Sequence, residues 1–143
     1  MFIKKLVLLL AALAATCAGA ETGNAQATRT WVSGTGTDNS NCSRTEPCQL
    51  FSQALAVTAN YGEIDCLDPG GFGTLTIAIP VTINCEGVSA AGVQATVSGA
   101  IGINITATGP VSLIGLDING TNQALNGVSI TSAAQVKIGR AHV

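Results

Sequence analysis

Acidic and amide side chains gather in two short sequences, DCLD and NCE, and these are the residues with the clearest capacity for chemistry. Their oxygen-bearing members are Asp65, Asp68, Asn84 and Glu86. Carboxylate and amide oxygens are the ligands that Ca²⁺ prefers. If position 65 corresponds to position 84 in a repeat of the chain, Asn84 lies beside Asp65, and an acidic patch that binds Ca²⁺ follows as one hypothesis. The alternative is that these acids only solvate the surface, as most exposed acids do.

Residues suited to acid–base or nucleophilic catalysis are scarce. A polysaccharide lyase needs a base, often Arg or Lys, and a glycoside hydrolase needs two carboxyl groups that face one bond. Between positions 45 and 136 the chain has no Lys, Arg or His. The cations beyond that stretch are Lys137 and Arg140, and the single histidine is His142. We therefore assign no catalytic residue and no resident cofactor, apart from the hypothesis that the acidic patch binds Ca²⁺.

The segment 1–20 has the pattern of an export signal. Lys4 and Lys5 precede the apolar run LVLLLAALAA, and an A-x-A sequence follows at positions 18–20. Such an apolar run is too short to span a bilayer, which needs about 20 residues. We predict cleavage after Ala20, with Ala27 as the alternative site. The mature protein is then secreted, periplasmic or extracellular, without a transmembrane segment.

Charge limits the partners of the mature chain. Without the two lysines of the leader, the chain carries four basic and eight acidic side chains, a net charge of −4. So few cations cannot neutralise a row of phosphates, which makes nucleic acid an unsuitable partner. A basic face for binding membranes is missing for the same reason.

Four cysteines follow the leader, and an even number in an exported chain predicts disulfides. Zinc is the competing interpretation, but the spacings of 6, 18 and 19 contain no C-x-x-C pair and no histidine accompanies them. We predict that Cys42 bonds Cys48 around the turn-rich sequence SRTEP. We predict that Cys66 bonds Cys85 because I-D-C at 64–66 returns as I-N-C at 83–85. The alternative for this second pair is two stacked thiols that act as small apolar residues.

One helix is expected, between Pro47 and Gly62. The apolar residues of LFSQAL recur at helical spacing, proline suits the first turn, and glycine suits the end. The segment 21–47, before the helix, is polar and rich in turn formers. We expect only a short strand there, at Trp31 and Val32.

Short strands dominate after Gly62, because apolar residues then alternate with polar ones, as in half-buried strands. The alternating runs are EIDCL, TLTIAI, VTINC, QATVS, GINIT, VSLIGLDI, GVSIT and QVKI. Turn-forming sequences such as PGGFG, EGVSAAG, TGP and NGTNQALN separate them.

These strands also repeat. GINIT at 102–106 returns as GVSIT at 127–131, and VSL at 111–113 returns as VKI at 136–138, whereas PVTI at 80–83 returns as PVSL at 110–113. Repeats of about 20–50 residues indicate a solenoid, in which each unit buries its apolar face against its neighbours. Since no helices lie between the strands, we predict an all-β parallel β-helix over the segment 48–137, with the helix capping its first coil. A β-sandwich is the alternative, although it does not require such a repeat.

The segment 138–143, IGRAHV, is predicted to be a non-native tail. Its codons can be written ATC GGA AGA GCA CAC GTC, which resembles a common short-read sequencing adapter. We interpret this end as read-through, so that His142 has no function and the natural protein is longer. A natural basic terminus is the alternative.

The sequence RTWVSGTGTDNSNCSRTEPCQLFSQAL, followed by GEIDCLDPGGFGTLTI, resembles the opening of secreted bacterial right-handed parallel β-helix proteins of the pectate-lyase-like superfamily. In that pattern a W-V-S-G strand leads to a loop, a P-C-x-x-F-x-x-A-[IL] helix caps the first coil, and a G-[DE]-x-[IV]-x-x-x-x-P-G strand and turn follow. The segment 29–119 shares this layout. The resemblance implies a right-handed coil but no single activity, because the superfamily includes lyases, hydrolases and adhesins.

Two functions follow from these observations. The first is an exported, non-enzymatic β-helix that acts as a surface or matrix scaffold and associates with polysaccharide. The second is the N-terminal part of a polysaccharide lyase or glycoside hydrolase whose catalytic coils lie beyond this sequence. The aromatic content of 3% leaves only Trp31 and Tyr61 as platforms for sugar stacking.

Overall fold

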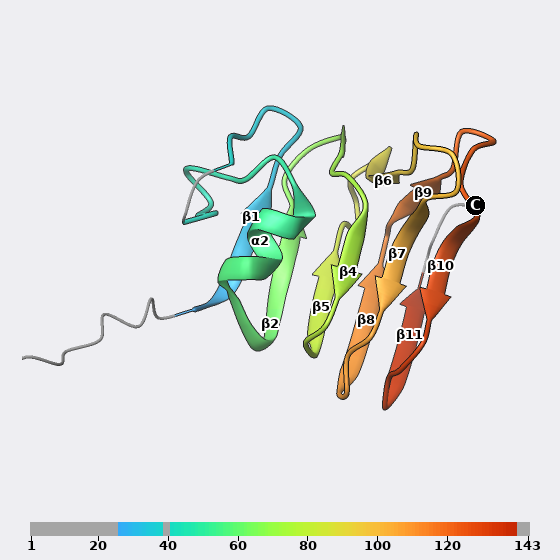
Figure 1. Ribbon diagram of the computed structural model, residues 1–143. Helices are drawn as coiled ribbons and strands as arrows, with labels where there is room; N and C mark the ends of the chain where they lie inside the picture. Colours follow the sequence, from blue (N-terminus) through green and yellow to red (C-terminus); the bar gives the residue numbers. More distant parts are fainter. Residues whose placement is uncertain (1–25, 39–40, 140–143) are drawn as a thin grey trace, which may run out of the picture.

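The computed structural model describes residues 26–38 and 41–139 (Figure 1). The described chain is mostly β-structure in parallel sheets, with one helix, as predicted. The predicted export signal, the cleavage site after Ala20 and positions 140–143 of the predicted tail lie outside the described residues.

The largest sheet has five strands, all parallel to their neighbours. In spatial order they are β1 (Ala27–Val32), β2 (Thr58–Cys66), β5 (Val81–Asn84), β8 (Pro110–Ile114) and β11 (Gln135–Gly139). The predicted strand at Trp31 and Val32 is thus confirmed as part of β1. Each strand of this sheet pairs with the strands that the chain forms on its preceding and its following passage through the same sheet.

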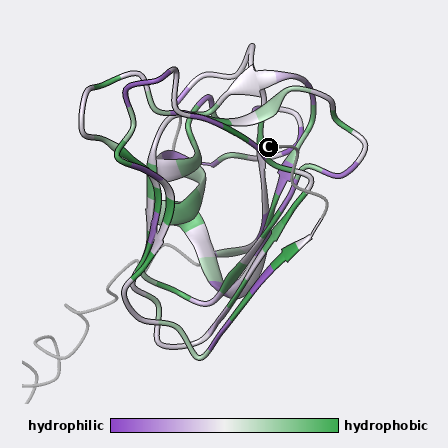
Figure 2. Ribbon diagram, turned by 90° about the vertical axis from the view of Figure 1, so that its right-hand side faces the viewer, coloured by the Kyte–Doolittle hydropathy of each residue, from purple (hydrophilic) through white to green (hydrophobic). Residues whose placement is uncertain are grey.

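Two smaller parallel sheets complete the described part of the structure. One contains β3 (Gly70–Gly71), β6 (Ala91–Gln94) and β9 (Asp117–Asn119), and the other contains β4 (Leu75–Ile77), β7 (Ile101–Ile105) and β10 (Asn126–Ile130). From β2 to β11 the chain visits the three sheets repeatedly, and each circuit returns it to the five-stranded sheet. Viewed along the stack, successive circuits overlie one another around a common interior (Figure 2).

The register confirms the repeat offsets read from the sequence. Ile64 pairs with Ile83, an offset of 19, and Ile83 pairs with Leu113, an offset of 30. Leu113 in turn pairs with Ile138, an offset of 25, and the same offset relates β7 to β10. Like side chains therefore stack on like across the circuits, which is the arrangement that lets each circuit bury its apolar face against the next.

Apolar residues at alternate strand positions fill the interior. Ile64, Ile83 and Leu113 are buried in the five-stranded sheet, and Ile77 and Ile105 are buried in the sheet of β4, β7 and β10. Complete burial of such a side chain contributes about 1.5–3 kcal/mol. The polar residues between them point outward, so the sheets are half-buried in the manner that the alternation predicts.

The helix α2 (Phe51–Val57) covers the interior at the β1 end of the stack, where it contacts β1, β2 and β4 (Figure 1). Its Phe51 ring packs edge-on against the ring of Phe72, with centroids 4.9 Å apart. The helix ends before the predicted stop at Gly62, because Thr58 is extended and begins β2. The Thr58 hydroxyl donates to the carbonyl oxygen of Ala54 at 2.6 Å and so closes the last turn.

Three strand predictions need correction. The run QATVS is not a strand, since β6 ends at Gln94 and the chain then turns to reach β7, leaving Val97 69% exposed. The run VSLIGLDI forms two strands in different sheets, β8 and β9, because the chain turns a corner at Gly115 with φ +67°. A Cβ atom on Gly115 would lie 2.6 Å from the amide nitrogen of Glu86, so only glycine fits this corner. The segment PGGFG, predicted as a turn, supplies β3.

The last described strand, β11, extends beyond the predicted end of genuine sequence at Lys137. Ile138 and Gly139 continue the strand and pair with Leu113 and Ile114 of β8. The interpretation of the segment 138–143 as read-through stays a prediction about the gene.

Candidate functional site

The outward face of the five-stranded sheet, here called the polar face, brings together charged and polar side chains from distant parts of the sequence. Parallel pairing aligns them in two rows that cross the strands. The first row is Arg29, Glu63, Thr82, Ser112 and Lys137, and the second is Trp31, Asp65, Asn84 and Ile114. Neighbouring members of a row lie on adjacent strands, which are about 4.8 Å apart in a sheet.

Arg29 links the edge strand β1 to β2 through two carboxylates. Its Nε donates to Oδ2 of Asp65, and its Nη2 lies 3.7 Å from Oε2 of Glu63. Its guanidinium carbon also lies 5.9 Å from the centroid of the Trp31 ring, within reach of a cation–π contact. The hydrogen bond and charge of Asp65, and then the charge of Glu63, raise the pKa of Arg29 above its ordinary value. The guanidinium therefore stays positive and holds the indole and both acids together.

Asn84 extends this network to β5. Its Nδ2 donates to Oε1 of Glu63 at 3.0 Å, and its Oδ1 accepts the backbone N–H of Glu86 at 3.0 Å. The amide thus bridges two strands and also fixes the turn that follows β5. Because both of its polar atoms have partners, Asn84 acts here as an organiser of the face.

Asp68 faces a different segment. Its carboxylate accepts the hydroxyl of Ser33 and the backbone N–H of Gly34, both at 2.6 Å. These two bonds tie the turn after β2 to the turn after β1, so the charge of Asp68 serves to hold two loops together.

The structure brings the predicted calcium ligands together only in part. The register places Asp65 beside Asn84, as the repeat predicts. However, Asp65 engages Arg29 and Asp68 engages the Ser33 loop, so their oxygens do not converge. Within the described segments 26–38 and 41–139, no three acidic, histidine or cysteine side chains are grouped closely enough to hold a metal ion. Calcium binding stays a prediction that has no preformed ligand set among the described residues.

Both predicted disulfides are present. Cys42 bonds Cys48 and Cys66 bonds Cys85, each with Cα atoms 4.7 Å apart. The second bond joins two neighbouring circuits just beyond the paired Asp65 and Asn84. It thereby fixes the register at the β2–β5 part of the polar face.

Two shallow pockets lie on the polar face. One has a volume of about 210 Å³ and includes Arg29, Trp31, Arg44, Asp65, Asn84 and Glu86 in its lining. The other has a volume of about 200 Å³ and is lined by Tyr61, Thr82, Pro110, Ser112, Gln135 and Lys137, above a floor of buried valines. Three residues of the second pocket could have been aligned from the sequence, because the offsets of 30 and 25 lead from Thr82 to Ser112 and from Ser112 to Lys137.

A third pocket, of about 480 Å³, lies beside the polar face at the corner after β5. Its lining includes Glu86, Val88, Ala90 and Asp117. It shares Glu86 with the pocket around Trp31, so the hollowed surface continues from the face toward the neighbouring sheet.

The chemistry that this face offers is recognition by hydrogen bonds and by aromatic contact. Hydroxyls, carboxylates, an amide and a guanidinium group stand on neighbouring strands, with one indole among them. Planar polar groups beside an aromatic ring suit a ligand that has many hydroxyls and one less polar surface. No step of bond making or breaking is assigned to these residues.

Comparisons with known proteins add no relative: no model of a protein family matches the chain, and neither a curated protein nor a solved structure does. The resemblance to secreted β-helix proteins accordingly rests on the motifs quoted above. Among the described residues there is no helix with the length and apolar character needed to cross a membrane.

Proposed function

We propose that this chain is an exported right-handed parallel β-helix that serves as a non-enzymatic surface or matrix scaffold and associates with extracellular polysaccharide. The observation that carries the proposal is the pair of polar rows on the five-stranded sheet, aligned by the register of successive circuits. The repeated passage through three parallel sheets supports the β-helix part of the proposal.

The spacing of the rows supports polysaccharide as the partner. Adjacent strands are about 4.8 Å apart, a distance close to the length of one pyranose unit in a chain. A glycan that lies along the stack would therefore place one sugar unit over each circuit. Thr82 and Ser112 would then meet equivalent hydroxyls of successive units, while Trp31 would meet a ring at the β1 end.

Two features support export. The N-terminal sequence has the order of an export signal, with positive charges, an apolar run and small residues. Both cysteine pairs form disulfides, which persist in oxidising compartments such as the periplasm or the extracellular space. The proposed location is therefore outside the cytoplasm.

Affinity electrophoresis of the exported protein through gels that contain single polysaccharides, neutral or acidic, tests this function. We expect at least one polysaccharide to retard the protein without releasing oligosaccharides. A Thr82→Ala variant should weaken the retardation, whereas Thr76→Ala, on the outward face of β4, should leave it unchanged. Free mobility in every gel would refute the association.

The enzymatic alternative predicts a different result in the same experiment. A lyase would release unsaturated oligosaccharides from a polyuronate, and Asp65→Ala would abolish the release. That outcome would replace the scaffold with a polysaccharide lyase.

A further inference from the structure

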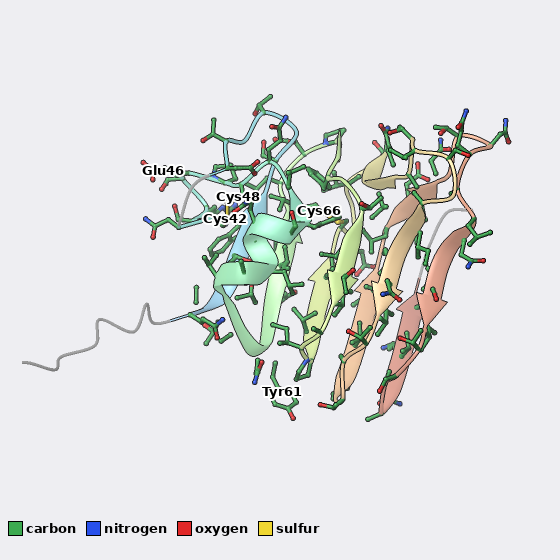
Figure 3. All side chains as sticks on the ribbon, viewed as in Figure 1. Cys42, Glu46, Cys48, Tyr61 and Cys66 are labelled. Carbon is green, nitrogen blue, oxygen red and sulfur yellow. A yellow bond between two sulfur atoms is a disulfide. The ribbon has the colours of Figure 1, made fainter. Side chains whose placement is uncertain are left out.

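Tyr61 combines two features that are unfavourable for folding. Its backbone has φ +63°, in the left-handed region, and the residue is 74% exposed. A bulky side chain is a genuine outlier at positive φ, where glycine or asparagine is the usual choice. In Figure 3 the Tyr61 side chain projects away from the ribbon of β2, within the stretch where the pairing of β2 with β1 shifts register.

The backbone at this irregularity of β2 does not need the tyrosine side chain. The backbone N–H of Tyr61 donates to the carbonyl oxygen of Pro80 at 2.7 Å, a bond that any residue other than proline can make. Because so much of the ring is in solvent, its burial returns little of the cost of the backbone conformation. A strained residue that carries an exposed aromatic ring indicates a binding role.

The ring stands at one end of the second pocket on the polar face. Thr82 and Ser112, on adjacent strands, line the pocket beside it, and Gln135 and Lys137 line the part formed by β11. The lining thus offers two hydroxyls, an amide and an ammonium group, and it includes no carboxylate among the described residues. This composition favours a ligand with hydroxyls and a negative charge.

We propose that Tyr61 is the stacking platform for one pyranose unit of an anionic glycan that runs across this pocket. The less polar face of the sugar packs on the phenol ring. Thr82, Ser112 and Gln135 bind hydroxyls of the following units, and Lys137 binds an anionic substituent of the unit that lies over β11. This inference rests on the proposed association with polysaccharide and adds to the contact at Trp31 a second aromatic contact, at the β2 end of the pocket.

Paired measurements of stability and binding test the role of Tyr61. Tyr61→Gly should leave the midpoint of thermal unfolding unchanged or raise it, because glycine accepts positive φ without strain. The same change should weaken binding to the retarding polysaccharide by about tenfold or more, as expected for an anchoring aromatic side chain. Tyr61→Phe keeps the ring and should retain binding. Val97→Ala removes a side chain of similar exposure, 69%, on a distant loop and should change neither quantity.

The outcomes separate this inference from the proposed function. If the wild-type protein binds a polysaccharide and Tyr61→Gly binds it equally well, the inference is wrong and the association stands. A lower unfolding midpoint for Tyr61→Gly would show a structural role and also refute the inference. If the wild-type protein binds no polysaccharide, the proposed function fails and the inference fails with it.

A separate experiment tests whether the bound glycan carries an anionic substituent. An acidic oligosaccharide and its carboxyl-reduced neutral counterpart are compared by titration calorimetry. We expect tighter binding of the acidic form, and we expect Lys137→Gln to remove that preference. Equal affinities of the wild-type protein for the two oligosaccharides would contradict an anionic substituent.

Discussion

Cys66 on β2 and Cys85 directly after β5 are bonded across a single circuit of the chain, with their Cα atoms 4.7 Å apart. That separation matches the spacing of adjacent strands, about 4.8 Å. The bond therefore joins two circuits at the distance that backbone pairing already sets, and it fixes the register on which the polar face depends.

Removing this disulfide should destabilise the protein. Replacement of Cys66 and Cys85 by alanine opens a loop with a sequence separation of 19 and should lower the free energy of unfolding by about 3 kcal/mol. Replacement of Cys42 and Cys48 opens a loop with a separation of only 6 and should cost about 2 kcal/mol. Urea denaturation of the two double variants compares them, and a larger loss from the shorter loop would contradict the assigned roles.

Adjacent residues of β5 should respond very differently to truncation. Ile83 is buried between Ile64 and Leu113, so Ile83→Ala leaves a cavity and should cost about 2–5 kcal/mol. Thr82 lies on the polar face, and Thr82→Ala should change the free energy of unfolding by about 0.5 kcal/mol or less. Equal losses in denaturant unfolding would mean that the strand does not present these two faces.

The sequence predicted the stacking of the circuits well, because stacking follows from which residues repeat. The match of I-D-C with I-N-C aligns Ile64 with Ile83, the match of P-V-T-I with P-V-S-L aligns Ile83 with Leu113, and the register agrees. The ends of individual elements depend on contacts between circuits, which no local pattern contains. Thus the alternation in QATVS predicted a strand, but the described ladder of β6 stops at Gln94 and the chain continues as a loop.

Alanine substitutions at two glycines with positive φ should distinguish the cost of backbone strain from the cost of a steric clash. Gly99→Ala, at φ +77° with open space around the new Cβ, should cost roughly 1–2 kcal/mol through strain alone. Gly115→Ala adds a contact of 2.6 Å with the backbone of the turn after β5 and should cost more. Thermal unfolding of both variants provides the comparison. A smaller loss at Gly115 would contradict the tight corner between β8 and β9.

The ion pairs of Arg29 should be insensitive to pH across the neutral range. Because folding raises the pKa of Arg29, the charged guanidinium stabilises the fold at every pH below the ordinary pKa of arginine. This stabilisation is lost only as the pH rises through the raised pKa of the folded state. The stability difference between wild type and Arg29→Ala should therefore stay constant between about pH 6 and 9. Because the Arg29 side chain is 53% exposed, added salt should reduce the difference. Unfolding midpoints measured across pH and salt test this, and a difference that changes across that pH range would contradict it.

The candidate site was less predictable than the fold. The offset of 19 correctly placed Asn84 beside Asp65, but one-dimensional spacing did not reveal that Arg29 would take Asp65 as its partner. Arg29 lies far from Asp65 in the sequence, and only the addition of β1 to the edge of β2 brings them together. Side-chain partners on neighbouring strands thus depend on the strand order, and the sequence repeat predicted that order only from β2 onward.

The position of a bound glycan tests the central claim, that the polar face of the five-stranded sheet associates with polysaccharide. Oligosaccharides of the retarding polysaccharide are added to isotope-labelled protein while backbone amide NMR signals are followed. The proposal predicts shifts centred on β2, β5 and β8, at Glu63, Thr82 and Ser112, with the signals of Thr76 and Ser129, in the sheet of β4, β7 and β10, unmoved. Shifts centred on β4, β7 and β10, or no shifts with any oligosaccharide, would contradict it.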